Sequence, residues 1–307
     1  PVEIAVLTTG WDGWNPKLVV EDLRVLDRAR AAATPLLSLP KVEMIVAWTS
    51  LPRFELTLKE LTIEGPRLAI RHDRSGVLRI AGLEIDPEEV AGDLPFTDWI
   101  LRQREIVIRD ALILWDDDLR NAPQLVLDRV QVRLENRFGH HRFGLKGTPP
   151  AELAAPLDLR GDLVFGSMKD WPNAQGRLYV RLDYADVAAW REWLPLPAQI
   201  ETGTGAMRLW FQFAPQDSRE IIADVELANV KAKLADDLPG VELAHLSGRV
   251  GTRQSGAQRE VFARALAFTT MTGERLDPVQ FKVTLREGTG DRQASGEFEF
   301  DQLQLGP

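Results

Sequence analysis

The chain has 307 residues, of which 44% are hydrophobic and 27% charged, and this balance indicates a folded protein with a sizeable core. Its 37 basic and 46 acidic residues give a net charge of −9, which argues against nucleic-acid binding and against docking on anionic membrane by charge alone. The absence of cysteine excludes a disulfide framework, cysteine-ligated zinc and thiol catalysis, and the longest apolar run, at residues 44–48, is far shorter than the ~18–20 residues that span a bilayer.

The first predicted elements are a short apolar strand at residues 2–7 and a glycine-containing turn at residues 10–16. The turn carries Trp11 and Trp14, which are candidates for exposed aromatic side chains as well as for a corner of the core. A longer strand follows, with apolar residues at Leu18, Val20, Leu23 and Val25.

The stretch from residue 54 to residue 85 alternates between apolar and polar residues, which is typical of strands with one buried face. Two polar residues instead of one separate Leu58 from Leu61, and this odd shift would turn Leu61 and Ile63 to the opposite face. We therefore expect a bulge or tight bend at Lys59-Glu60 that returns these side chains to the side of Leu58.

The same pattern, with apolar residues at relative positions 0, 2, 5 and 7, occurs eight times at irregular intervals. The copies begin at Leu18, Leu56, Ile106, Leu125, Val225, Val241, Val261 and Phe298. Repeated bulges bend and twist strands while each strand keeps one apolar face. The pattern therefore predicts an all-β fold of long, bulged, mostly antiparallel strands in a curled sheet or open β-groove, with a few short helices.

Three short helices are expected. Asp86-Pro87 has the residues of a helix start, a second helix is expected from Thr97, and Asp186 would cap an amphipathic helix at residues 187–194. These elements suggest an N-terminal β unit at residues 1–85, a helical connection at 86–104, and a continuing β-groove at 105–307 with one helix near 187–194.

The sequence gives little support for an enzyme. The four histidines, His72, His140, His141 and His245, have no metal-ligand spacing, and residues 116–118 lack the glycine and terminal glutamate of a calcium loop. We expect no catalytic residues, no metal site and no cofactor. A glycosidase pair of carboxylates stays open, because only their spatial separation would reveal it.

One stretch resembles a known family. Residues 61–83 read LTIEGPRLAIRHDRSGVLRIAGL and are similar to the L-x-I-x-x-P-x-L-x-I-x-R-D-x-x-G-x-L-x-I-x-G-L pattern of AsmA-like envelope proteins, with His72 inserted between Arg71 and Asp73. Residues 11–16, 98–101, 115–117, 149–150 and 190–197 resemble the YhdP branch of that family in their order along the chain.

The resemblance implies a protein of the Gram-negative envelope that an N-terminal helix anchors in the inner membrane and that extends into the periplasm as a long curled sheet with an apolar groove. Such proteins are implicated in moving phospholipid toward the outer membrane and in keeping its permeability barrier. By this resemblance, the chain would be an N-terminal portion without its anchor, and its partners would be phospholipid acyl chains, the membrane through that anchor, and envelope proteins.

The candidates for lining such a groove are the apolar members of the repeated pattern: Leu56, Leu58, Leu61, Ile63, Ile106, Ile108, Leu125, Leu127, Val225 and Leu227. The alternative for each is a place in a closed β core. Two other functions stay open: a structural or assembly module that recruits envelope proteins by strand addition, and a carbohydrate-active β protein.

Overall fold

A computed structural model describes residues 2–25, 37–48, 57–80, 83–85, 95–193, 199–215, 218–233, 239–286 and 295–301. The contacts between residues divide the chain into two compact units. Unit 1 comprises residues 1–150 and 160–172, and unit 2 comprises residues 151–159 and 173–307. The expected connection at residues 86–104 falls partly on residues that the structure does not describe, so the domain division expected from the sequence stays a prediction.

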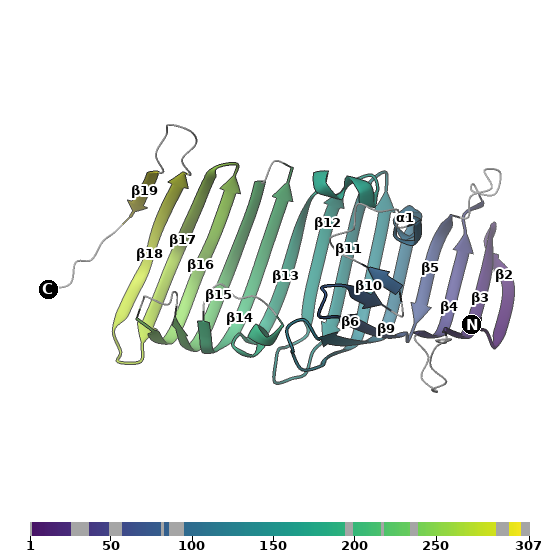
Figure 1. Cartoon of the computed structure of the whole chain (residues 1–307), viewed down its shortest axis with the longest axis horizontal. Coiled ribbons are helices and arrows are strands. Elements are labelled where there is room, and N and C mark those ends of the chain that lie inside the picture. The colour runs from purple at the N-terminus through teal and green to yellow at the C-terminus, as the bar shows by residue number, and fades with distance from the viewer. Residues whose placement is uncertain are drawn as a thin grey trace. The chain divides into compact units, whose positions relative to one another are not determined.

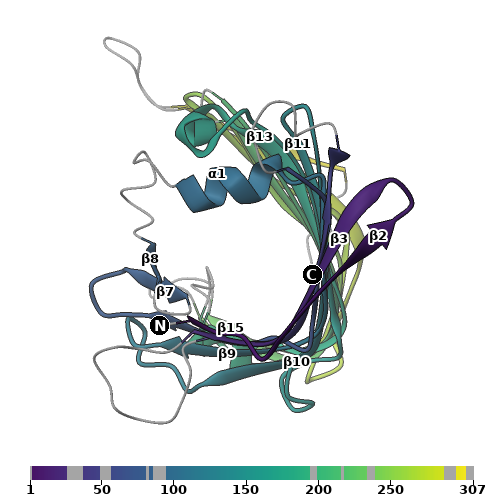
Figure 2. The same ribbon diagram turned by 90° about the vertical axis from the view of Figure 1, so that its right-hand side faces the viewer.

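In its described residues, unit 1 is a curled sheet with one α-helix (Figure 1). Its elements are β1 (Val2–Glu3), β2 (Val6–Asp12), β3 (Asn15–Val25), β4 (Leu37–Val46), β5 (Leu58–Glu64), β6 (Arg67–His72), β7 (Leu78–Ile80), β8 (Leu83–Ile85), α1 (Pro95–Arg102), β9 (Glu105–Asp117), β10 (Leu125–Arg137) and β11 (His140–Thr148). The strands lie side by side in the order β2–β3–β4–β5–β9–β10–β11. Neighbours in this order pair antiparallel, except that β5 lies parallel to β9. The strand β6 also lies parallel to β9, along a later part of it. Figure 2 shows α1 on the inner side of the curve that β9, β10 and β11 make.

Unit 2 is an antiparallel meander in which each strand pairs with the next along the chain. Its strands are β13 (Gln175–Asp186), β14 (Gln199–Ala214), β15 (Ser218–Lys233), β16 (Val241–Ser255), β17 (Gln258–Thr270), β18 (Arg275–Arg286) and β19 (Ser295–Phe300). The chain passes from one unit to the other after residue 150, within β12 (Leu157–Val164) and within the 3-10 helix η2 (Met168–Asn173). A second 3-10 helix, η3 (Ala189–Glu192), completes the described elements. The predicted fold class is confirmed.

The predicted bends are present at all seven inserts that lie within the described residues. Five of these inserts place their second residue in the left-handed region, with φ between 48° and 54°: Asp22, Asp110, Arg129, Asn229 and Ala265. At the other two the pairing register shifts, and the expected bulge at Lys59 is one of them, since Val46 pairs with Leu58 while Ile45 pairs with Glu60. The eighth insert, at residues 301–302, extends beyond the described residues.

The parallel pairing in unit 1 depends on two bends that match. Glu64 pairs with Arg109 and Arg67 pairs with Leu112, so each strand has two residues between these pairs. Gly65 has a φ of 64°, and its N–H donates to the Arg109 carbonyl at 2.8 Å, while the Leu112 N–H donates to the Pro66 carbonyl at 2.9 Å. The two strands therefore bend together without losing their hydrogen bonds.

Glycine is required where bent strands of unit 2 approach most closely. A Cβ atom on Gly248, whose φ is 146°, would lie 2.8 Å from the Leu266 Cα and 2.9 Å from the Ala265 carbonyl oxygen. Both atoms belong to the backbone of β17, so the neighbouring strand itself would have to move. Gly205 on β14 is similar, because its Cβ would lie 2.0 Å from the Glu226 carbonyl oxygen.

Two of the expected helices differ from the prediction, and the third lies outside the described residues. The helix expected from Thr97 begins at Pro95. In place of an amphipathic α-helix at 187–194, the structure has the 3-10 helix η3. The Val187 N–H donates to the Gly203 carbonyl, so Val187 is still bonded to the sheet, and the Trp190 indole N–H donates to the Leu153 carbonyl. These two bonds replace the start of an α-helix. The helix expected to start at Asp86 falls on residues that the structure does not describe.

The close approach at Gly248 gives a stability test. We expect Gly248→Ala to lower the free energy of unfolding by about 2 kcal/mol or more, since the added methyl group overpacks two backbones. Gly240→Ala is a matched control just before the same strand, where a Cβ meets nothing closer than 3.8 Å, and should change stability by less than about 0.5 kcal/mol. Urea unfolding measures both, and equal stability of the two variants would contradict this account of the bend.

Candidate functional site

The strand registers of unit 1 place apolar side chains in two rows across one face of the sheet. Directly paired residues on neighbouring strands share a face, so the rows follow from the pairing. The first row is Leu7, Val20, Val42, Ile63, Ile108, Val132 and Leu145. The second row is Leu18, Met44, Leu61, Ile106, Leu134 and Phe143. No charged residue interrupts either row.

The opposite face of the same strands carries charges. Lys17 lies 2.9 Å from Glu43, and Lys41 lies 3.0 Å from Glu43 and 3.3 Å from Glu64. Hydrogen bonds from Lys17 and Lys41 hold the pKa of the Glu43 carboxyl below its ordinary value. These ion pairs are partly solvated, so they contribute little to stability, but they identify this face as the one that water covers.

Unit 2 repeats the division between the two faces. One face has a row of Leu178, Phe211, Ile221, Thr252, Val261, Val283 and Phe298, beside a row of Val180, Leu209, Ala223, Val250, Ala263, Phe281 and Phe300. The other face carries ion pairs between strands. Arg249 binds both carboxylate oxygens of Asp224, at 2.5 Å and 2.8 Å, and this lowers the pKa of Asp224 below its ordinary value.

The apolar face of unit 2 is only partly covered. A tightly buried cluster of Val187, Leu227, Val230, Ala232 and Leu243 lies beside the bends. Away from the bends, Ile221 is 45% exposed, Phe298 53% and Phe300 47%. In a closed sandwich the inner faces of two sheets interdigitate and become dry. Within the described part of unit 2, these side chains have no such second layer.

The candidate lining residues fall into groups. Leu61 pairs with Ile106 and Ile63 with Ile108, so these four form adjacent parts of the two rows of unit 1. Leu127 pairs with Ile113 and Leu125 with Trp115 beyond the bend, while Val225 and Leu227 lie on β15 opposite Met207 and Gly205. Leu56 lies outside the described residues. Whether any of them holds a ligand stays a prediction.

The sequence pattern missed most of the apolar face of unit 2. Leu178, Val180, Leu209 and Phe211 lie in its rows but belong to no copy of the interrupted pattern, since their strands alternate without an insert there. Plain period-two alternation was the signal that could have found them.

Leu58 is a special case, because it is 1% exposed and lies where α1 meets the sheet. Its N–H donates to the Gln103 side-chain oxygen at 2.7 Å, and Gln103 in turn donates to the Trp99 carbonyl of α1. Since Leu58 and Leu61 share a face across the bulge, and α1 lies inside the curve (Figure 2), the apolar rows line the concave side of unit 1.

A buried polar network fixes the end of α1 to the sheet. Asn136 on β10 donates to the carbonyls of Ile100 and Gln103, at 3.1 Å and 2.7 Å, and its oxygen lies 2.7 Å from the His141 Nδ1. The His141 Nε2 lies 3.1 Å from the Phe165 carbonyl. Burial lowers the pKa of the His141 imidazole below its ordinary value, although the bond to Phe165 opposes this. The network gives the carbonyls of Ile100 and Gln103 a donor from the sheet, and the Ile100 carbonyl also accepts from the Gln103 N–H.

Titratable side chains in the described part of the chain form ion pairs and hydrogen bonds with their neighbours. No group of three or more His, Asp or Glu side chains there is placed to hold a metal ion. Asp117 is buried, and although burial would raise its pKa, hydrogen bonds from Arg120 lower it. The facing carboxylates Glu105 and Glu135 both bind Arg133, at 3.0 Å and 2.9 Å, so they are ion-paired.

Comparison with known proteins then identifies the chain's relatives. A model of the YhdP protein family matches residues 1–306. The chain belongs to the YhdP family. No match was found among curated proteins or among solved structures. Among the described residues, no helix has the length and apolar character needed to cross a membrane.

The buried histidine predicts a pH dependence. Because the pKa of His141 is lowered in the folded state, the unfolded chain takes up a proton first as the pH falls below about 6.5. The free energy of unfolding should therefore decrease from about pH 7 to about pH 5, by at most about 1.4 kcal/mol per pH unit from this group. His141→Gln should remove that part of the slope, whereas His245→Gln, at an exposed strand position, should keep it. Urea unfolding over this pH range tests the prediction, and equal slopes for the native chain and His141→Gln would contradict it.

Proposed function

We propose that this YhdP-family chain is part of a β-groove that holds phospholipid acyl chains in the periplasm of a Gram-negative cell and supports phospholipid transport to the outer membrane. The observation that carries the proposal is the partly exposed apolar face. Each unit presents rows of mostly aliphatic and aromatic side chains, without a charged residue, on one face and ion pairs on the other.

The energetics favour a chain-like ligand over a compact one. Each methylene that leaves water for an apolar surface gains about 0.8 kcal/mol. Because the rows run across neighbouring strands within each unit, a flexible acyl chain can follow them from strand to strand. The apolar rows contain no charged group that could bind a headgroup. The headgroups would therefore stay in water, while the acyl chains lie against the rows.

Non-enzymatic action fits the same geometry. A surface that exchanges acyl chains needs neither a nucleophile nor a metal. The alternative of an assembly module has one specific observation in its favour, the exposed strand β2, where Val6 and Leu7 are 46% and 59% exposed. Strand addition there would add to lipid binding rather than replace it, because the rows of unit 2 do not involve β2.

A pair of variants tests the proposal. Ile221 faces the groove on β15, and Gln212 faces the opposite side on β14, where it pairs with Glu220. Both residues are largely exposed, so Ile221→Glu and Gln212→Glu should each leave the fold intact. We expect the native chain and Gln212→Glu to co-purify with phospholipid, and Ile221→Glu to retain less than about half as much, because a carboxylate in an apolar row costs several kcal/mol.

Native mass spectrometry and solvent extraction measure the bound lipid, and circular dichroism checks folding. Ile221→Glu that is folded and carries as much phospholipid as Gln212→Glu would contradict the proposal. Native protein that carries none, even after incubation with phospholipid vesicles, would contradict it as well.

A further inference from the structure

One lateral edge of unit 1 gathers exposed aromatic and unpaired basic side chains from distant parts of the sequence. The pairs Asp12–Asn15, Val46–Leu58 and Arg137–His140 place the ends of six strands at this edge. The Arg104 N–H donates to the Leu58 carbonyl at 3.1 Å, which brings the start of β9 there too. We define the aromatic–basic edge as Trp11, Trp14, Trp48, Arg104, Arg137 and Phe138.

Its aromatic side chains are unusually exposed. Trp14 is 89% exposed, Trp11 68%, Trp48 55%, and Phe138, at the tip of the β10–β11 hairpin, is fully exposed. The Trp11 and Trp48 rings lie 6.5 Å apart, so two of the tryptophans form one patch. Large aromatic side chains gathered in water mark a surface that contacts something less polar than water. Tryptophan in particular prefers the headgroup level of bilayers.

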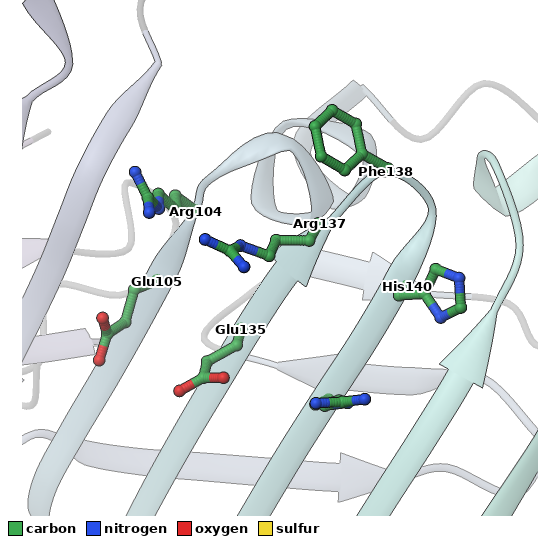
Figure 3. Close-up of a pocket in the computed structure, with 7 residues that line it drawn as sticks. Arg104, Glu105, Glu135, Arg137, Phe138 and His140 are labelled. Atoms are coloured by element: carbon green, nitrogen blue, oxygen red, sulfur yellow. The ribbon is translucent and has the colours of Figure 1, made fainter.

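The arginines of this edge lack carboxylate partners in the described part of the chain. Figure 3 shows Arg104 and Arg137 at the rim of a hollow of about 620 Å³, with Phe138 above them and His140 beside them. The nearby carboxylates are ion-paired with other basic side chains. Arg133 binds both Glu105 and Glu135, and Lys59 binds Asp12 at 2.9 Å.

The opposite edge of unit 1 differs in this respect. There Arg71 binds Asp118, Arg79 binds Asp73, and Arg120 binds Asp117. A guanidinium without a carboxylate is available to phosphate, which it can bind through two parallel hydrogen bonds.

We propose that the aromatic–basic edge docks on the surface of a bilayer that contains anionic phospholipid. The tryptophans and Phe138 would enter the headgroup region, and Arg104 and Arg137 would bind lipid phosphates. Charge complementarity selects this occupant: the chain as a whole carries −9, so an anionic surface repels most of it and attracts this edge. The docking goes beyond the groove function and does not require an acyl chain in the groove.

Flotation of the native chain with vesicles tests the proposal. Vesicles of phosphatidylcholine alone are compared with vesicles in which about a third of the lipid is phosphatidylglycerol, the anionic fraction being what draws basic side chains. Arg104→Gln with Arg137→Gln should weaken binding to the anionic vesicles by about 25-fold, at about fivefold per arginine. Trp14→Ser with Phe138→Asn should weaken binding to both kinds of vesicle, and asparagine suits the left-handed φ of 48° at position 138.

The control is Leu119→Ser with Arg74→Gln, which removes an exposed apolar and a basic side chain from the opposite edge and should bind like the native chain. Ile221→Glu, in unit 2, should also float normally, so a failure of docking and a failure of the groove proposal are distinguishable. The proposal is overturned if the native chain does not float with anionic vesicles, or if the edge variants bind as well as the control. Retention on insoluble polysaccharide without flotation would assign the tryptophans to sugar stacking and overturn it too.

Discussion

The bend that each long strand makes at its inserted residue is the constraint on which the rest of the structure depends. A strand that gained one residue without bending would send half of its apolar side chains to the wrong face. A left-handed residue absorbs the extra length at a cost of roughly 1–2 kcal/mol for a residue other than glycine. Asp22, Asp110 and Asn229 are residue types that tolerate this conformation best, while Arg129 and Ala265 bear the full cost. Because neighbouring strands bend together, the sheet curls.

The curl has a consequence for how the apolar face can be covered. A flat sheet buries its apolar face against a second sheet, but a concave face is difficult for another sheet to fill. In unit 1, α1 covers the region around Leu58 and is held there by Gln103 and Asn136. In unit 2 the rows through Ile221 and Phe298 stay about half exposed. The chain therefore keeps an apolar surface in contact with solvent, which is costly unless a ligand covers it.

Much of this could be predicted from the sequence because bends and faces are local properties. The polar inserts at 59–60, 109–110 and 128–129 indicate a bulged strand without any knowledge of its partners. Long-range features gave no such signal. The parallel pairing of β5 and β6 with β9, and the bonds from Gln103 to Leu58 and from Asn136 to His141, join residues that no spacing rule connects. The helix expected at 187–194 failed for the same reason, since the partners of Val187 and Trp190 lie elsewhere in the chain.

The most direct measurement uses the alternation of β16. A photoreactive amino acid is placed in turn at Arg249, Val250, Thr252 and Arg253, and crosslinking to phospholipid is measured in vesicles and in envelope preparations. Val250 and Thr252 belong to the apolar rows, and Arg249 and Arg253 face the other side. The account predicts lipid crosslinks at positions 250 and 252 and none at 249 and 253. Crosslinks at all four positions, at none, or only on the charged face would contradict it.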